Sequence, residues 1–252
     1  MHLQNLYELR MIHNPQSSAP DLRSDVVPQH IGLILDGNRR WAKSQGLPTL
    51  EGHRRGYENL KTIARESFNL GVKYVSAYIF STENWSRTKE EVDYLMNLAM
   101  KMATKDAKEL IKENIKIIVL GIEDRVDPKL IKAWRDAEED SKNNTGGTLA
   151  LCFNYGGQIE ITDAVKRIVQ SGIETKDVTP ELIESNLYHP ELPAVDFMIR
   201  TSGEQRISNF MLWRMAYAEM YFADVHWPDF SIEELGRALD EFASRNRRFG
   251  GN

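Results

Sequence analysis

Short apolar runs alternate along this chain with longer stretches whose apolar residues recur every three or four positions. Runs of the first kind are typical of strands buried in a parallel sheet, and stretches of the second kind are typical of helices that cover such a sheet. Six strands are expected, at residues 31–35, 72–80, 115–120, 149–154, 195–199 and 220–225. Helices are expected at residues 52–71, 90–112, 128–140, 159–169 and 179–187, and after Ser231. The order of these elements predicts an α/β fold: a single domain with a central, mostly parallel six-stranded sheet flanked by helices.

The N-terminal part of the chain lacks this alternation. Leucine and isoleucine recur at helical spacing only between Leu3 and Ile12, and residues 14–20, rich in proline and serine, end the pattern. We therefore expect residues 1–27 to form a loosely ordered extension and residues 28–252 to form one folded domain. No apolar run approaches the length of a membrane span, and residues 1–27 lack the apolar core of a signal peptide.

Composition excludes several functional classes. The 252 residues are 41% hydrophobic and 27% charged, which is usual for a globular protein. A net charge of -5 argues against a nucleic-acid-binding protein, which is normally basic. Cys152 is the only cysteine, which excludes disulfides within the chain and cysteine-cluster metal sites and favours a reducing compartment. We expect a cytoplasmic protein that binds no nucleic acid.

Polar chemistry begins where the first predicted strand ends. Asp36 follows the apolar run directly, and Gly37 and Asn38 suit a tight turn. Three cations surround this single acid, namely Arg39, Arg40 and Lys43. A Mg²⁺-diphosphate would suit this set, because Mg²⁺ prefers carboxylate oxygens and guanidinium groups bind phosphate. The alternative is that Asp36 caps the following helix while the arginines lie in solvent, and this stretch alone does not choose between the two.

Three further predicted strands also end in polar or glycine-rich segments. These segments lie at residues 81–84, 154–157 and 200–203. In a parallel sheet the carboxyl ends of all these strands meet at one edge, and open α/β sheets bind their ligands there. We therefore expect one site at this edge rather than four unrelated loops.

The segment after the fifth predicted strand is the richest in phosphate-binding groups. Arg200, Arg206 and the Ser208 hydroxyl provide the donors that a second diphosphate would need. The alternative is a set of surface arginines paired to nearby glutamates. Glu219 follows within a mostly apolar and aromatic stretch, where an acid needs a partner, either a metal ion or an arginine.

The predicted helix at residues 90–112 carries a broad apolar stripe that includes Met96, Met100 and Met102. Such methionines usually fill a core. A helix that walls an apolar cavity would show the same pattern, so both interpretations stay open at this point.

Five segments together resemble the cis-prenyltransferases, and most closely the bacterial undecaprenyl diphosphate synthases. They are residues 36–41, 80–87, 154–157, 200–210 and 227–230, which read DGNRRW, FSTENWSR, NYGG, RTSGEQRISNF and WPDF. The resemblance covers roughly residues 28–251, with all five segments in order. It implies that residues 28–252 form a cis-prenyltransferase catalytic domain.

The resemblance implies a homodimeric, Mg²⁺-dependent α/β enzyme with an apolar product tunnel. Its activity would be the addition of isopentenyl diphosphate to an allylic diphosphate, with farnesyl diphosphate as the expected starter, to form Z double bonds. The expected product is undecaprenyl diphosphate for a cell-wall lipid carrier, and its release would involve peripheral contact with a membrane. Two alternatives stay open: a Z-prenyl diphosphate of short or medium chain length, and a non-catalytic partner subunit of the same fold.

The resemblance also implies roles for single residues. Asp36 and Glu219 would hold Mg²⁺, and Asp36 and Asn84 would take part in catalysis. The first diphosphate and the reacting ends would be bound by Gly37, Asn38, Arg39, Arg40, Trp41, His53, Ser81, Thr82, Glu83, Trp85 and Arg87. Isopentenyl diphosphate would be bound by Arg200, Arg206 and Ser208. Residues 248–251 resemble a C-terminal tail that reaches across the dimer.

Three positions depart from the usual bacterial pattern. Thr49 stands where a phosphate-binding arginine is usual, and Arg39 stands where glycine is usual. We expect Arg39 to replace the missing cation. Ile79 stands where long-chain members often carry a small residue at the mouth of the product tunnel, which weakens an inference about product length.

Overall fold

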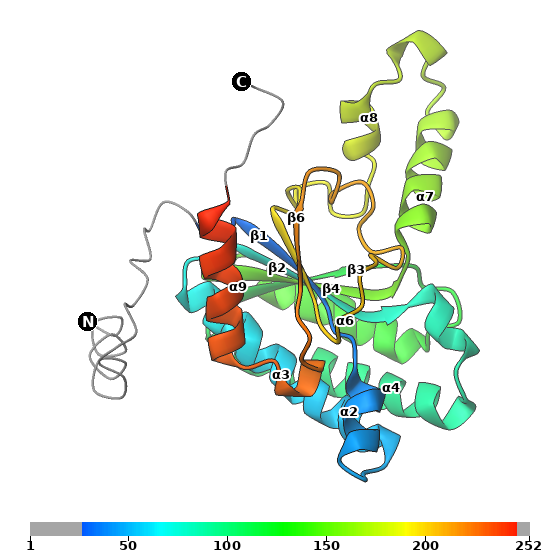
Figure 1. Cartoon of the computed structure of the whole chain (residues 1–252). Coiled ribbons are helices and arrows are strands. Elements are labelled where there is room, and N and C mark those ends of the chain that lie inside the picture. The colour runs from blue at the N-terminus through cyan, green and yellow to red at the C-terminus, as the bar shows by residue number, and fades with distance from the viewer. Residues whose placement is uncertain (1–26, 246–252) are drawn as a thin grey trace.

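The computed structural model describes residues 27–245, and at its centre is a twisted sheet (Figure 1). Its strands are β1 His30–Ile34, β2 Tyr74–Ser81, β3 Ile115–Leu120, β4 Gly147–Tyr155, β5 Phe197–Arg200 and β6 Glu219–Phe222. They lie in the order β3-β4-β2-β1-β5-β6, and every neighbouring pair is parallel. The predicted α/β fold with six strands is confirmed, and the sheet is wholly rather than mostly parallel.

In the described part of the chain, helices join each strand to the next, except that an irregular segment joins β5 to β6. The α-helices are α2 Asn38–Ser44, α3 Thr49–Asn69, α4 Lys89–Lys101, α5 Ala107–Lys112, α6 Pro128–Ser141, α7 Gly157–Gln170, α8 Pro180–Glu184 and α9 Ile232–Ser244. Short 3-10 segments lie at Thr82–Ser86, Thr175–Asp177 and Trp227–Asp229, and a π-helical turn lies at Met102–Asp106.

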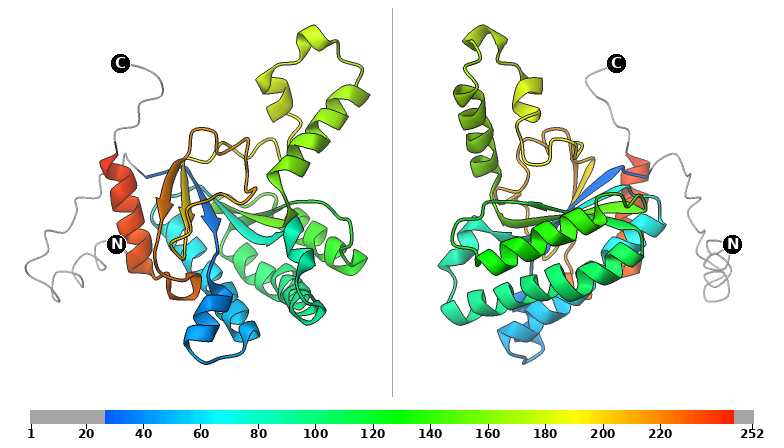
Figure 2. Two further views of the ribbon diagram at one scale, coloured as in Figure 1. Left: turned by 45° about the vertical axis from the view of Figure 1, so that its right-hand side comes forward. Right: turned by 180° about the vertical axis from the view of Figure 1, so that it is seen from behind.

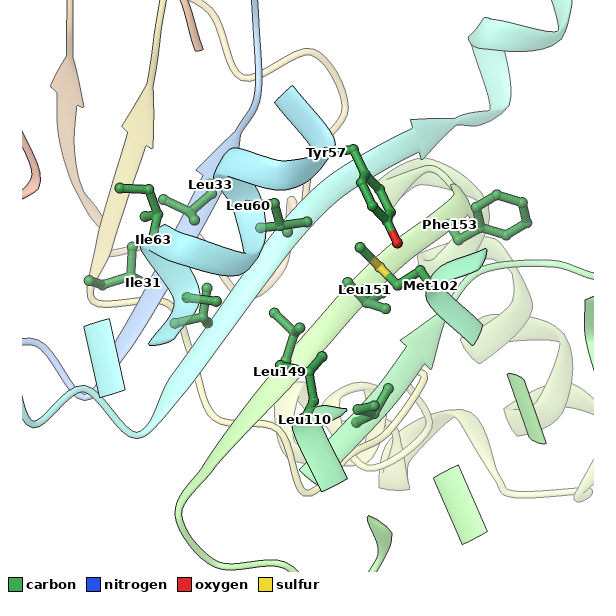
Figure 3. Close-up of a cluster of buried hydrophobic side chains, with 14 of the residues drawn as sticks. Ile31, Leu33, Tyr57, Leu60, Ile63, Met102, Leu110, Leu149, Leu151 and Phe153 are labelled. Carbon is green, nitrogen blue, oxygen red and sulfur yellow. The ribbon is translucent and has the colours of Figure 1, made fainter. Parts of the chain in front are cut away.

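The two faces of the sheet are covered differently. Helices α3, α4, α6 and α9 cover one face, where the larger hydrophobic cluster includes Leu33, Ala77 and Leu151 (Figures 2 and 3). The irregular segment between β5 and β6 lies over the other face, against Met198 and the fully buried Cys152. Since side chains of a strand alternate between the faces, successive residues of β4 and β5 serve the two clusters in turn.

Helix α3 starts earlier than the spacing of its apolar residues predicts. The expected start was Gly52, but the helix begins at Thr49, directly after Pro48. Proline 48 has extended backbone and therefore marks the turn into the helix. The first turn of α3 is largely polar, so its hydrophobic pattern does not reveal it.

The helix expected at residues 90–112 is divided. The π-helical turn Met102–Asp106 separates α4 from α5, and its Met102, Ala103 and Asp106 are all buried. Asp106 contacts Tyr57 and Lys61 of α3 through this turn. The apolar spacing continues through the turn, so the sequence pattern predicts one unbroken helix.

Helices α7 and α8 form an arm that projects from the body of the molecule (Figure 1). A buried ion pair holds the base of this arm, with Arg214 donating to Glu160 at 2.6 Å. Glu160 also accepts a hydrogen bond from the Tyr155 hydroxyl at 2.5 Å. The arm is therefore fixed to the carboxyl end of β4, next to the edge where the candidate residues gather.

Two predictions fall outside the described residues: the N-terminal extension, apart from Val27, and the tail at residues 248–251. Among the helices between residues 27 and 245, none is both long and apolar enough to cross a membrane.

Candidate active site

The candidate site forms where β1 and its neighbour β5 end side by side. Ile34 is level with Arg200 in the register of the two strands, so Asp36 comes within reach of that arginine. Asp36 accepts from Arg200 at 2.7 Å and from Arg40 at 3.1 Å, and Arg206 lies 3.9 Å away. Guanidinium groups from β5, from α2 and from the loop after β5 thus surround one carboxylate, as expected for an anion site.

The environment of Asp36 keeps it ionised. Burial would raise its pKa, but the hydrogen bond and charge of Arg200, and then those of Arg40, outweigh burial and hold the pKa below its usual value. The interpretation of Asp36 as a helix cap is wrong, because Gly37 is the N-cap of α2 and no side chain caps that helix. Asp36 is thus available to bind a cation.

Gly37 makes the turn after Asp36 possible. Its φ is 103°, in the left-handed region, and a Cβ atom there would lie 2.2 Å from the Ser202 hydroxyl oxygen. Two further contacts fix the turn: the Asp36 carbonyl accepts from the Thr201 hydroxyl at 2.7 Å and from the Trp227 N–H at 3.0 Å. The loops after β5 and β6 therefore determine where Asp36 points.

Arg200 connects the two groups of residues that were expected to bind diphosphates. Its side chain is only 4% exposed. Besides Asp36, it donates to the Ser208 hydroxyl at 2.8 Å and to the Arg206 carbonyl at 2.5 Å. Arg200, Arg206 and Ser208 therefore converge as predicted, at a position next to Asp36.

Glu204 bridges two cations of this site, so the alternative of surface arginines paired to nearby glutamates describes Arg206 correctly. Its carboxylate accepts from Arg40 at 2.6 Å and from Arg206. Both arginines are largely exposed and could instead present their forked donors to a phosphate. Glu204 thus holds Arg40 and Arg206 in place. A diphosphate that entered the site would replace the Glu204 carboxylate as the acceptor of their hydrogen bonds.

A cavity of about 800 Å³ opens beside Asp36. The polar part of its lining comes mainly from the segment after β1 and the start of α3, namely Asp36, Gly37, Asn38, Arg39, Arg40, Lys43, Thr49 and His53. The apolar part comes mainly from α3, β2 and α4, namely Leu60, Ile79, Phe80, Leu95, Leu98, Ala99 and Met102. A mouth lined by cationic side chains thus leads into an apolar interior, and the cavity-wall interpretation is right for Met102.

His53 lies in the cavity wall as part of a buried polar chain. Its Nε2 donates to Glu91 at 2.9 Å, and Glu91 also accepts from Arg87 at 2.8 Å. Burial lowers the pKa of His53, and the hydrogen bond to Glu91 only partly offsets it. Burial would raise the pKa of Glu91, but the bond from His53 and the charge of Arg87 lower it below its usual value. These contacts therefore hold the neutral imidazole of His53 against the anionic carboxylate of Glu91.

The end of β2 contributes Asn84 and Arg87 to the cavity lining. Asn84 and Ser81 cap each other, because the Asn84 side chain accepts from the Ser81 N–H at 3.1 Å and the Ser81 side chain accepts from the Asn84 N–H. The 3-10 segment Thr82–Ser86 is built on this pair. Its geometry presents Asn84 to the cavity.

Several predicted binding residues lie behind the cavity rather than in its lining. Trp41 donates to Asp229 at 2.8 Å, and Trp85 donates to Asn154 at 2.8 Å. Glu83 accepts from Asn209 at 3.2 Å. In the described chain the lining does not include these three residues, nor Ser81 and Thr82. Their contacts support the loops that carry Arg40, Asn84 and Arg87.

Glu219 does not join Asp36 within this chain. It pairs with Phe197 at the amino end of the parallel strands, whereas Asp36 follows their carboxyl end. Its carboxylate accepts from Arg245 at 2.8 Å. The predicted metal role is therefore wrong for a site built by one chain, and the alternative of an arginine partner describes Glu219 correctly.

Tyr57 of the cavity wall and Glu91, which lies behind the wall and holds His53, are residues that sequence reasoning missed. Glu91 contacts His53 from 38 residues away along the chain, and Tyr57 lines the cavity from α3. One weak signal was present: Glu91 is an acid on the apolar side of its helix, next to Val92. The contacts themselves depend on how α3 and α4 pack, which spacing does not reveal.

Comparison with known proteins assigns the chain to a family. A family described as putative undecaprenyl diphosphate synthase matches residues 34–250. An isoprenyl transferase from Thermotoga maritima is 44% identical over 227 residues, which are 89% of this chain and 97% of that protein. An isoprenyl transferase from Clostridium acetobutylicum is 44% identical over 238 residues, or 92% of this chain and 93% of that protein.

Two solved structures share the fold. A lavandulyl diphosphate synthase from Lavandula x intermedia, in complex with dimethylallyl diphosphate, has a TM-score of 0.85 at 35% identity and covers 90% of this chain and 99% of its own. A probable undecaprenyl diphosphate synthase from Campylobacter jejuni has a TM-score of 0.75 at 28% identity and covers 88% of this chain and 98% of its own.

Proposed function

The chain belongs to the undecaprenyl diphosphate synthase family of isoprenyl transferases, the cis-prenyltransferases, and we propose that it adds isopentenyl diphosphate to an allylic diphosphate to make a Z-prenyl diphosphate. One observation carries the proposal: the cavity of about 800 Å³ joins an anion-binding mouth at Asp36 to an apolar interior. A substrate with a diphosphate head and a hydrocarbon tail matches both ends of this cavity.

The allylic substrate would lie with its diphosphate at the mouth of the cavity. Arg39, Arg40 and Lys43 supply positive charge there, and Asn38 and Thr49 supply polar atoms. Its hydrocarbon tail would point inward, between α3, β2 and α4. We propose farnesyl diphosphate as the starter, because its hydrocarbon tail matches the apolar lining of the interior.

Isopentenyl diphosphate would bind at Arg200, Arg206 and Ser208, on the other side of Asp36. Arg206 is exposed, so its guanidinium can turn from Glu204 to a phosphate. Arg200 is buried and already fixed by Asp36 and Ser208, so its position costs little to organise on binding. The two substrates would then meet across Asp36.

The residues at this site fit Mg²⁺. Asp36 is ionised and 26% exposed. Between residues 27 and 245 there is no group of three or more acidic, histidine or cysteine side chains that could hold a metal by themselves. Mg²⁺ commonly takes one or two carboxylates together with substrate phosphates. Bound by Asp36 and the allylic diphosphate, it would supply charge that stabilises the leaving diphosphate.

The reaction follows from this arrangement. The allylic C–O bond breaks and its electron pair leaves with the diphosphate, whose charge the arginines stabilise. The double bond of isopentenyl diphosphate attacks the electron-poor allylic carbon, a C–C bond forms, and a proton leaves. The apolar lining from Phe80, Leu95 and Leu98 keeps water from the electron-poor carbon.

The resemblance favours undecaprenyl diphosphate, and we keep this as the proposed product. A short- or medium-chain product is the alternative, because Ile79 of the cavity lining stands where long-chain members often carry a small residue.

We further propose a homodimeric, cytoplasmic enzyme that contacts membranes only peripherally, when it releases its product. The arm formed by α7 and α8 supports self-association, because Val165 and Val169 expose apolar side chains along α7. A second copy of the chain would cover them. A non-catalytic partner subunit is disfavoured, since Asp36, Asn84 and Arg200 are all in place.

The test is an incubation of the purified protein with radiolabelled isopentenyl diphosphate, farnesyl diphosphate and Mg²⁺, with products resolved by chain length. Labelled Z-prenyl diphosphates are expected, and EDTA should abolish them. If no label from isopentenyl diphosphate is added to farnesyl, geranyl or dimethylallyl diphosphate, the proposed activity is refuted. Products of C55 length would support undecaprenyl diphosphate as the product, and shorter products would support the alternative.

A further inference from the structure

The cavity is closed at its inner end by solid core. Along α3 its lining runs from Thr49 to Leu60, and along α4 it continues to Met102, the first residue of the π-helical turn. Beyond these residues the interior is filled, because Ile63, Leu110 and other side chains of the same cluster are fully buried (Figure 3). A growing chain would therefore meet the lining residues Tyr57, Leu60, Met102 and Phe153, which we call the floor of the cavity.

Tyr57 differs from the other floor residues because polar contacts hold it in place. Its ring reaches from α3 toward Met102 (Figure 3), and its hydroxyl donates to Asp106 in the π-helical turn. Lys61 donates to the same Asp106 carboxylate at 3.0 Å. The Nζ atoms of Lys61 and Lys101 lie 5.0 and 4.8 Å from the centre of the Tyr57 ring.

The polar groups around Tyr57 are all paired with one another. Glu58 accepts from both lysines, from Lys61 at 2.6 Å and from Lys101 at 3.0 Å. The Asp106 side chain is only 3% exposed, so its charge needs these partners. Burial would lower the pKa of Lys61, but the bonds to Glu58 and Asp106 raise it, so the amine stays charged. Burial, and then the bond to Asp106, raise the pKa of Tyr57, so its hydroxyl remains a donor.

Displacement of Tyr57 would break this network. A ring that swung aside to admit a longer chain would remove a donor from a buried carboxylate, which is costly. Leu60 and Phe153 have no polar group to lose, and Met102 has a flexible side chain that adapts easily. Among the floor residues, Tyr57 is therefore the one that resists an advancing chain most strongly.

We propose that Tyr57, held by the buried Asp106–Lys61 pair, is the residue that stops elongation and so sets the length of the product. This inference rests on the proposed function and adds to it the residue that sets product length. The π-helical turn has a role in it, because it carries both Met102 of the floor and Asp106 of the tether.

The experiment compares the products of Tyr57→Ala, Tyr57→Phe and Asp106→Asn with those of the unchanged full-length enzyme, from labelled isopentenyl diphosphate and farnesyl diphosphate. Tyr57→Ala removes the stop, and its main product should lengthen by about one isoprene unit or more. Tyr57→Phe and Asp106→Asn keep the ring and weaken the tether, so they should add a minor fraction of longer products. Tyr217→Ala is the matched control, because Tyr217 is 82% exposed, and it should leave product length unchanged.

Each outcome has a distinct meaning. An unchanged product length from Tyr57→Ala with measurable turnover would overturn the inference. If Tyr57→Ala gives longer products but Tyr57→Phe and Asp106→Asn do not, the bond to Asp106 does not help Tyr57 to stop the chain. If thermal unfolding shows that Tyr57→Ala does not fold, Tyr57→Leu replaces it, and the same shift is required. Failure of the unchanged enzyme to make any prenyl product would instead refute the proposed function.

Discussion

Asp36 and Arg200 meet because β1 and β5 are neighbours in a parallel sheet and end at the same level. The contact gives Asp36 a lowered pKa and fixes Arg200 beside Ser208. One carboxylate thus lies between two groups of phosphate donors. Removal of single residues should therefore affect the two substrates differently.

Replacement of Asp36 by alanine should reduce turnover by on the order of 10²-fold or more, because stabilisation of the leaving diphosphate is lost. Binding of isopentenyl diphosphate should be largely kept, since Arg200 remains bonded to Ser208 at 2.8 Å. Single-turnover rates and equilibrium binding measure the two effects separately. Near-normal turnover at saturating Mg²⁺ would contradict the assignment of Asp36.

Replacement of Arg206 by alanine should raise the Michaelis constant for isopentenyl diphosphate more than that for farnesyl diphosphate. The loss of one charge-assisted contact costs roughly 1.5–3 kcal/mol, or about ten- to a hundredfold. Arg237→Ala is the control, because Arg237 forms a similarly exposed ion pair on α9. Equal increases for both substrates would show that the two diphosphate sites have been misassigned.

Arg39 and Thr49 line the same cavity, so an arginine at either position could reach one diphosphate. Arg39→Gly should weaken binding of farnesyl diphosphate, because a phosphate donor is lost. Addition of Thr49→Arg should restore much of the affinity and give a clear coupling energy in a double-mutant cycle. If Arg39→Gly has no effect, or Thr49→Arg does not rescue it, the two positions do not compensate for each other.

At the scale of elements, the strands were predicted better than the site. Buried parallel strands leave short apolar runs, and all six runs correspond to strands. The first turn of α3 and the π-helical turn at Met102–Asp106 were missed because neither changes the apolar spacing. Both depend on contacts made after folding.

The strand-end residues of the site were predicted for the same reason. Topology brings the carboxyl ends of parallel strands together, so Asp36 and Arg200 could be expected to meet. Glu91 and Tyr57 lie on helices, where neighbours depend on the packing of α3 against α4. Glu219 does not reach Asp36 within one chain, because its position along β6 depends on register, which sequence spacing does not give.

Strand β1 also carries a pH-sensitive group, His30, which is fully buried. Its Nδ1 bonds to the Pro193 carbonyl at 2.9 Å and its Nε2 bonds to the Ser76 hydroxyl at 2.7 Å. Burial lowers the pKa of His30 from 6.5 to about 4. Below pH 6.5 the unfolded chain therefore binds a proton that the folded chain does not. As the pH is lowered from 6.5 to about 4, the free energy of unfolding decreases.

The contribution of His30 to this loss should approach about 3 kcal/mol. Urea unfolding of the unchanged protein and of His30→Gln, at neutral pH and near pH 4.5, isolates the contribution of His30. The carboxylates titrate in both proteins, so their contribution cancels in the comparison. His30→Gln should lose less stability than the unchanged protein on acidification. An equal loss in the two proteins would show that His30 does not contribute.

At the scale of the whole molecule, one buried ion pair joins the projecting arm to the site. Arg214 donates to Glu160 of α7 and to the carbonyl groups of Tyr188 and His189, which follow α8. Close by, the Gly157 N–H donates to the Asn209 carbonyl at 2.7 Å, next to Ser208. The arm and the loop that carries Arg206 and Ser208 are therefore fixed to the same point of the sheet.

Removal of one partner of this pair should destabilise the whole fold. Glu160→Ala leaves Arg214 charged, buried and without its carboxylate, which should lower the free energy of unfolding by roughly 3–5 kcal/mol. Urea unfolding measures this loss, and Glu139→Ala is the matched control, because Glu139 forms an exposed pair with Lys142 that should contribute less than about 1 kcal/mol. The double variant Glu160→Ala, Arg214→Ala should lose less stability than the two single losses together, because neither charge is left alone. Additive losses, or a small effect of Glu160→Ala alone, would show that the pair does not hold the arm to the sheet.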